Sequence, residues 1–132
     1  MTMTDETTNN DLSTKFVSVE EILESDDRKI EVVHVPEWGG NVILKVMGSK
    51  ERDAFELSCI EKKGRSKEDS MLNIRARLLA ACLVDQEGNL MFQKHQIDDL
   101  GKKSSAVISR LFDKAQRVNL MTDEDIDDLS EI

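Results

Sequence analysis

The sequence predicts an α+β domain in which an N-terminal β-hairpin packs on a small bundle of four to five short helices. Two observations favour this class: apolar residues alternate with a period of two between residues 30 and 47, and they recur at helical spacing over most of the following chain. The length of 132 residues is typical of one domain. We expect a disordered acidic or polar tail at residues 1–17, the single domain at 18–120, and an acidic C-terminal helix or tail at 121–132.

The hairpin is expected from two β-branched runs that flank a turn. Gly39 and Gly40 supply the positive φ angles that a two-residue hairpin turn requires. Pro36 has no N–H to donate, so its strand should lie at an edge of the sheet. This register makes one face of the hairpin wholly apolar. The facing pairs are then Val35 with Leu44, Val33 with Val46 and, on the other face, His34 with Lys45.

Helical spacing predicts the other elements. Ser18 and Glu21 have the spacing of a capping box, so a short helix should begin at residue 18. Residues 78–84 are apolar on every side and predict a buried central helix. Gly101 is expected to end its helix in the left-handed conformation. The helices after the hairpin are expected at residues 49–63, 69–84, 94–100 and 104–118, and a last acidic turn follows Thr122.

Charge is distributed unevenly along the chain. Acidic residues outnumber Lys and Arg 27 to 18, which gives a formal net charge of −9. The first 29 residues carry eight acids and three bases, and the last 12 carry six acids and no base. Phosphate backbones repel such a protein, so we expect no nucleic acid partner. The longest apolar run is far shorter than the roughly 20 residues that span a bilayer, and the N-terminus does not have the pattern of a secretory signal. We expect no membrane contact and a cytosolic location.

Catalytic and metal-binding patterns do not occur in the sequence. No nucleophile elbow, phosphate-binding loop, dinucleotide turn or zinc-protease helix is present. Cys59 and Cys82 lie inside apolar helical patterns, which is typical of small buried hydrophobic residues. A zinc site with His34 and His95 would need ligand pairs at short spacing that the chain does not have. We therefore expect no enzymatic activity, no cofactor and no metal.

A few residues are candidates for contact with a protein partner. Trp38 at the hairpin tip is either a lid on the small core or an exposed anchor, since Trp is enriched at binding hot spots. Methionines adapt to varied apolar surfaces, although each of them also suits the core. Arg75 belongs either to a solvated basic face or to a surface for acidic segments. The candidate partner-binding residues are Trp38, Met71, Leu72, Arg75, Leu79 and Met91.

Six local patterns occur in a distinctive order. They are VPEWGG at 35–40, ERDAFE at 51–56, RARLL at 75–79, LVDQEG at 83–88, LGKKSSA at 100–106 and AQR at 115–117. In order and spacing they resemble the small tail assembly chaperones of long-tailed bacteriophages. The resemblance covers residues 19–129 and leaves the polar segment 1–16 without a counterpart.

The resemblance implies a non-enzymatic chaperone that binds and solubilises the tape measure protein and helps recruit tail tube subunits. Members of this family commonly make a second, longer product by ribosomal frameshifting. The resemblance implies that this chain is the shorter of the two products. The resemblance also implies action in the host bacterial cytoplasm, absence from the mature virion, and an option of homo-oligomers. The acidic C-terminus leaves one alternative: a small acidic adaptor or inhibitor that mimics nucleic acid and blocks a basic partner.

Overall fold

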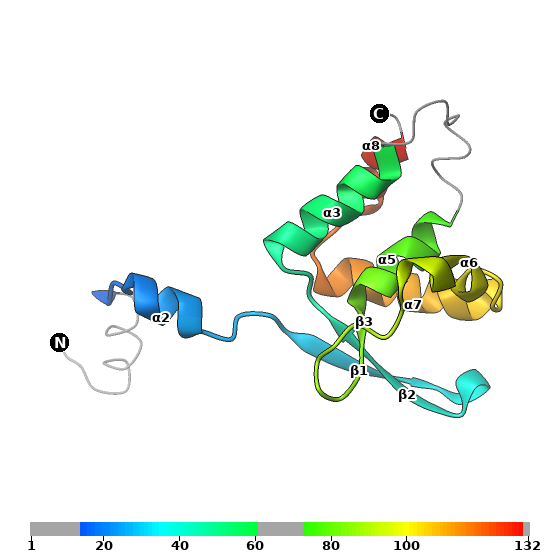
Figure 1. Cartoon of the computed structure of the whole chain (residues 1–132), viewed down its shortest axis with the longest axis horizontal. Helices are drawn as coiled ribbons and strands as arrows, with labels where there is room; N and C mark the ends of the chain where they lie inside the picture. The colour runs from blue at the N-terminus through cyan, green and yellow to red at the C-terminus, as the bar shows by residue number, and fades with distance from the viewer. Residues whose placement is uncertain (1–13, 61–72, 131–132) are drawn as a thin grey trace.

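An antiparallel sheet of three strands carries the helices on one of its faces (Figure 1). The structure is a computed structural model that describes residues 14–60 and 73–130. The strands are β1 (Ile30–Val35), β2 (Gly40–Lys45) and β3 (Leu83–Val84), in the order β1-β2-β3. The predicted α+β class is confirmed, and the sheet has one strand more than the predicted hairpin.

The hairpin has a different connection from the predicted one. Pro36 begins a 3₁₀ turn, η1 (Pro36–Trp38), and Gly39 alone takes a positive φ, of 80°. The four connecting residues, 36–39, are centred two positions before the predicted turn at Gly39 and Gly40, so the predicted register is wrong by four positions. An even shift keeps each residue on its face, so Val33 and Val35 still point into the core. The observed pairs are Val35 with Gly40, His34 with Asn41, Val33 with Val42 and Glu31 with Leu44.

The central helix is shorter than predicted. Helix α5 (Ile74–Cys82) ends before Leu83, and residues 83 and 84 pair with β2 as a strand. The prediction of helix through residue 84 is therefore wrong at this end. An apolar run fits a buried strand as well as a buried helix, and here the backbone groups of β3 bond to β2. The predicted start of the helix, at residue 69 or 70, lies outside the described residues.

The described residues contain four further helices around α5. Helix α7 confirms the amphipathic pattern predicted for residues 104–118, and α8 is the helix at the predicted acidic turn. Gly101 follows α6 with φ −66°, so the predicted left-handed conformation is wrong. A Cβ at this position would instead collide with the side chain of Asn73. These helices are α3 (Ser49–Ile60), α6 (Ile97–Leu100, after the 3₁₀ turn η2 at Lys94–Gln96), α7 (Ser105–Val118) and α8 (Asp123–Ser130).

The core lies between the sheet and these helices. Cys59 and Cys82 are buried, as predicted. Helix α8 contributes Ile126 and Leu129 to the same cluster, which joins the acidic end of the chain to the core. The largest fully buried side chains come from β2, α5, β3 and α7, and they include Leu44, Leu78, Leu79, Leu83 and Leu111.

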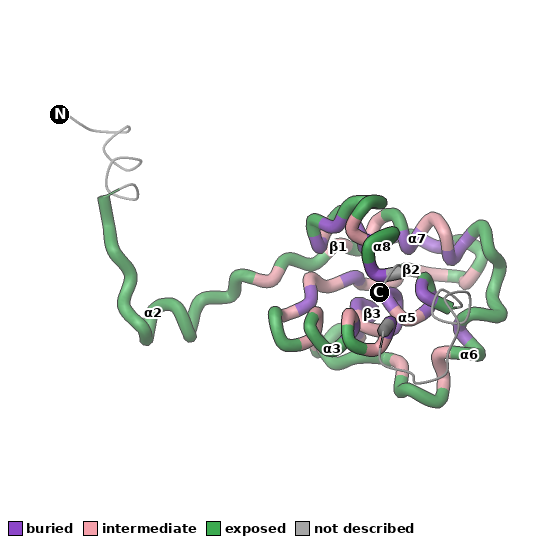
Figure 2. The backbone as a smooth tube through the Cα atoms, turned by 90° about the horizontal axis from the view of Figure 1, so that it is seen from above, coloured by how far each residue is buried: buried purple, intermediate pink, exposed green. Residues whose placement is uncertain are grey.

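Helix α2 (Val19–Glu24) stands apart from the domain (Figures 1 and 2). The predicted capping box is confirmed: the Glu21 N–H donates to Ser18 Oγ, and the Ser18 N–H donates to Glu21 Oε1. No residue of α2 is buried. The helix is therefore stabilised locally and buries none of its apolar side chains.

Candidate partner-binding surfaces

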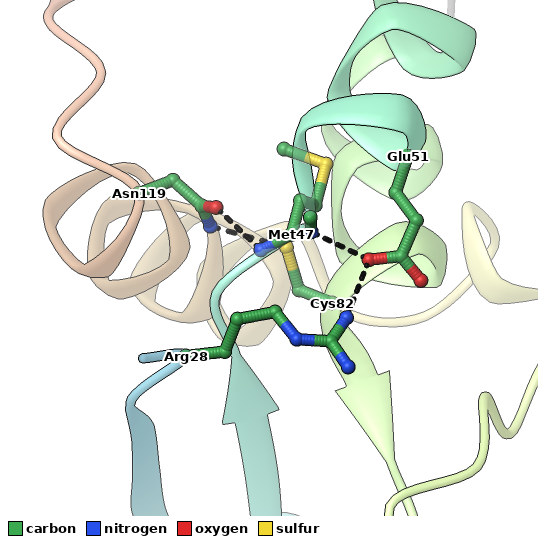
Figure 3. A network of polar contacts seen from close by, with 6 residues as sticks. Arg28, Met47, Glu51, Cys82 and Asn119 are labelled. Carbon is green, nitrogen blue, oxygen red and sulfur yellow. Dashed lines mark hydrogen bonds and ion pairs between the residues drawn. The ribbon is translucent and has the colours of Figure 1, made fainter. Parts of the chain in front are cut away.

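A polar junction holds the sheet and three helices together (Figure 3). Asn119, which follows α7, is buried, and its Oδ1 accepts a hydrogen bond from the Met47 N–H at 2.8 Å. Its Nδ2 donates to the Ala115 carbonyl at 2.9 Å and to Cys82 Sγ at 3.4 Å. Arg52 of α3 donates to the Asn119 carbonyl at 3.3 Å. One amide thus connects the end of β2 with the ends of α5 and α7, so this junction is structural.

A second set of bonds fixes the start of α3. Glu51 Oε1 accepts from the Gly48 N–H at 2.6 Å and pairs with Arg28 Nη1 at 3.1 Å (Figure 3). The Lys29 carbonyl accepts from the Val46 N–H at 2.9 Å. The chain that enters β1 is therefore tied to the sheet and to α3 from residue 28 onward.

The described residues contain no group of three His, Cys, Asp or Glu side chains that could hold a metal ion. Burial raises the pKa of the Cys82 thiol to about 12, and the hydrogen bond from Asn119 opposes this only in part. Such a thiol stays protonated near neutral pH and is a poor nucleophile. Within residues 14–60 and 73–130, no helix is long and apolar enough to span a bilayer.

The hairpin tip is attached to α7 by an ion pair. Arg110 donates to both carboxylate oxygens of Glu37, at 2.8 and 3.1 Å. The guanidinium of Arg110 is the main reason that the pKa of Glu37 falls to about 2. Trp38, next in the chain, is half-buried and packs on the core. Trp38 therefore has features of both predicted roles: it packs on the core, as a lid would, and it stays partly accessible, as an anchor would.

Arg75 occupies a second position beside α7. Its guanidinium lies 5.5 Å from the centroid of the Phe112 ring, a cation–π distance. Arg75 also lines a shallow pocket of about 170 Å³, together with Lys103 and Ile108. Since Arg75 is exposed, it can meet an acidic partner.

Of the other predicted residues, the structure describes Leu79 and Met91. Leu79 has no exposed surface and belongs to the core, so in this fold it offers nothing to a partner. The prediction that Leu79 contacts a partner is therefore wrong for this fold, because Leu79 lies on the side of α5 that faces the core. Met91 is half-exposed, and its N–H donates to the Leu83 carbonyl. Met91 is therefore positioned by β3, whereas Trp38 and Arg75 are positioned near α7. Met71 and Leu72 lie outside the described residues.

The outer face of the sheet carries an apolar row that was not among the predicted partner-binding residues. We call this the outer row; it consists of Val32, Ile43, Val84 and Leu90, which are neighbours across the strands. Val32 and Leu90, at its two ends, are 58% and 51% exposed. One signal was available: apolar residues occupy both alternating sets in residues 30–35 and 42–46. Strands of that kind usually meet apolar surface on both faces.

Two of the comparisons with known proteins gave a match. Residues 22–130 match the sequence model of a family described as phage tail assembly chaperone. Among solved structures, the tail assembly chaperone of bacteriophage HK97 is similar to this chain, with a TM-score of 0.54 and 18% identity. That alignment covers 89% of this chain and 99% of the other, and at this identity it supports the fold. A comparison with curated proteins gave no match.

Proposed function

Because this chain belongs to the phage tail assembly chaperone family, we propose that it binds the tape measure protein of its phage and keeps that protein soluble before tail assembly. The observation that carries the proposal is the family match over residues 22–130, which includes the three strands and the helices α3, α5, α6, α7 and α8 of the described residues. A tape measure protein is long and largely helical, so before assembly it presents apolar stripes to water. A protein that covers such stripes must expose apolar surface of its own.

The proposed contact surface consists first of the candidate residues that are accessible in the structure. Trp38 and Arg75 adjoin α7, and Met91 adds a half-exposed apolar side chain beside β3. Trp and Arg are the residue types most enriched at binding hot spots. Met71 and Leu72 stay within the proposal as sequence-based candidates.

The proposal extends to the later steps of tail assembly. We infer that the bound chaperone helps recruit tail tube subunits, with a longer frameshifted form as one means, and that it acts in the host cytoplasm and leaves before the virion is complete. The net charge of −9 supports the solubilising role, because a charged complex resists association with its own kind.

Co-expression of the tape measure protein with a tagged chaperone tests the proposal. We expect the chaperone to keep the tape measure protein in the soluble fraction and to copurify with it. Trp38→Ala, Arg75→Glu and Met91→Asp should each reduce the copurified amount several-fold, since hot-spot residues carry most of the binding energy.

Leu57→Asp is the matched control for Met91→Asp. Leu57 lies on α3 and is 54% exposed, against 50% for Met91. This variant should copurify as the unchanged protein does. If the unchanged chaperone neither solubilises nor retains the tape measure protein, the proposed function is wrong. If it does both and the three variants bind fully, the function stands and the surface is wrong.

A further inference from the structure

We propose that the pocket between the first turns of α5 and α7 binds the carboxylate of an Asp or Glu side chain on a helical segment of the tape measure protein. The inference rests on the proposed function, and it names the chemistry that one part of the contact surface recognises. Three features of the pocket support it: its cations, its hydroxyl groups and its size.

This α5–α7 pocket lies where the two helices pack side by side (Figure 1). Its volume is about 170 Å³. The apolar lining residues Ile74, Ala76 and Ile108 are buried, so they form the base of the pocket. The polar lining residues are Asn73, Arg75, Lys103, Ser105 and Ser109.

The cations of the pocket lack a counter-charge. None of the residues lining it is acidic. Within residues 14–60 and 73–130, neither Arg75 nor Lys103 forms an ion pair. Asp98 of α6 accepts a hydrogen bond from Asn73 Nδ2 at 2.6 Å and does not line the pocket. An anionic group from a partner would therefore meet two positive charges that the described part of the chain leaves unpaired.

Arg75 is oriented in advance for such a group. Its guanidinium lies 5.5 Å from the centroid of the Phe112 ring, and Phe112 is 7% exposed and belongs to the core. The cation–π contact restricts the guanidinium before any partner binds. A guanidinium can donate two parallel hydrogen bonds to one carboxylate, which makes Arg75 the main donor of the pocket.

Two hydroxyl groups add donors beside these cations. Ser105 and Ser109 are four residues apart on α7, so they lie on one side of that helix. Neither hydroxyl bonds to another residue in the part of the chain that the structure describes. A hydroxyl can donate to a carboxylate oxygen, so four side chains around one pocket can each donate to an anion.

The size and net charge decide which anion is the occupant. Sites for small molecules usually have volumes of about 300–1,000 Å³, and this pocket is smaller. One side-chain group fits it better than a metabolite does. Phosphates of a nucleic acid come in a dense row, which a chain of net charge −9 repels, whereas a single carboxylate beside an apolar stripe adds little repulsion.

The pocket lies close to Trp38 along α7. Arg110, the residue after Ser109, donates to Glu37, and Glu37 precedes Trp38 at the hairpin tip. From Ser105 to Arg110 the helix rises by about 7.5 Å. A client helix with an acidic residue at the edge of its apolar stripe can therefore place that acid in the pocket and an apolar side chain near Trp38.

Overlapping peptides that span the tape measure protein test the inference. Each peptide is made in its natural form and in an amide form, with every Asp replaced by Asn and every Glu by Gln. We expect the full chain to bind its preferred natural peptides about tenfold more tightly than their amide forms, since hydrogen bonds to charged groups are the stronger ones. The net charge of −9 alone predicts the opposite order, because it repels acidic peptides.

Lys103→Glu and Lys102→Glu form a matched pair of variants. Lys102 is also exposed, pairs with Asp99 at 3.6 Å and does not line the pocket. An acid near the start of α7 is favourable to the helix, so both variants should fold, which circular dichroism checks. We expect Lys103→Glu to lower peptide binding and copurification of the tape measure protein about tenfold. Lys102→Glu should behave as the unchanged chain does.

The results separate the pocket from the proposed function. If the unchanged chain retains neither the tape measure protein nor any peptide, the proposed function is wrong and the inference falls with it. If it binds and the two lysine variants bind equally, or the amide peptides bind as tightly as the natural ones, only the inference is overturned. An oligonucleotide that binds the unchanged chain and not Lys103→Glu would assign the pocket to phosphate and also overturn it.

Discussion

At the scale of single residues, the buried side chain of Asn119 joins three elements of the fold. It is 6% exposed, and its amide bonds to groups of β2's end, α5 and α7. A buried polar group is stabilising only while its partners are in place, and removal of one partner leaves another unsatisfied. The sequence placed Asn119 at the end of a helix and gave no sign of these contacts, because they depend on residues 37 and 72 positions away.

Replacement of Asn119 by Ala should lower the free energy of unfolding by about 1–3 kcal/mol. The reason is that the Met47 N–H loses its acceptor in a buried position. Urea denaturation followed by circular dichroism measures the change. Asn41→Ala is the control: Asn41 is exposed and bonds to His34, so its loss should cost less than about 0.5 kcal/mol. Equal stabilities of the two variants would contradict the role of the junction.

The Cys82 thiol should make stability fall at alkaline pH. Its pKa is about 12 in the folded chain against an ordinary value of 9.0. Above pH 9 the unfolded chain releases this proton and the folded chain keeps it, so the free energy of unfolding decreases as pH rises. The limiting slope is about 1.4 kcal/mol for each pH unit. We expect Cys82→Ala to show a flatter decline between pH 9 and 10.5 in denaturation experiments; parallel declines would argue against a buried thiol.

At the scale of elements, the secondary structure of strongly periodic segments could be predicted, and that of short apolar runs could not. Helix α7 has apolar residues on one side and charged residues on the other, so the sequence alone located it. Residues 83 and 84 follow α5 without any polar break, and only pairing with β2 distinguishes strand from helix there. The hairpin register depends on where the turn begins. The turn begins at Pro36, and the Gly39-Gly40 pair alone did not indicate this start.

The contact of α6 with the start of α5 gives a test at this scale. Gly101 leaves room for the Asn73 side chain, whose Nδ2 donates to Asp98 at 2.6 Å. Gly101→Ala should cost about 0.5–1.5 kcal/mol in free energy of unfolding, because the exposed Asn73 side chain must move and give up its bond to Asp98. Asn73 has φ 61°, which Gly tolerates, so a second substitution Asn73→Gly should recover part of that cost.

A double-mutant cycle measured by denaturation reports this coupling. Gly40→Ala serves as the control, because nothing lies within 4 Å of a Cβ at that position. Additive effects of Gly101→Ala and Asn73→Gly would show that the close approach is not what selects glycine.

At the scale of the whole molecule, the sequence predicted the class of fold and the family, and only some of the candidate partner-binding residues are accessible in the structure. Trp38 and Arg75 are accessible in the structure, whereas Leu79 is in the core. The apolar pattern of α5 continues around the helix, so periodicity could not say which side faces outward. The outer row was missed because a third strand, absent from the prediction, completes it.

The acidic C-terminus separates the chaperone from an acidic inhibitor that mimics nucleic acid. Glu124 and Asp128 are exposed on α8, whereas Ile126 and Leu129 hold α8 on the core. Glu124→Gln with Asp128→Asn removes two charges and leaves the packing intact. We expect this variant to copurify with the tape measure protein as well as the unchanged chain does. A large loss of binding, at unchanged stability, would favour the inhibitor.

The junction at Asn119 also orders events during synthesis of the chain. Met47 leaves the ribosome long before residue 119, which lies 72 positions later. Until then the backbone at the end of β2 lacks its acceptor and the inner face of the hairpin lacks α7. During most of the remaining translation, the hairpin therefore stays incomplete and exposes apolar residues on both faces. Such exposed apolar surface favours aggregation until the last helices emerge and cover the inner face.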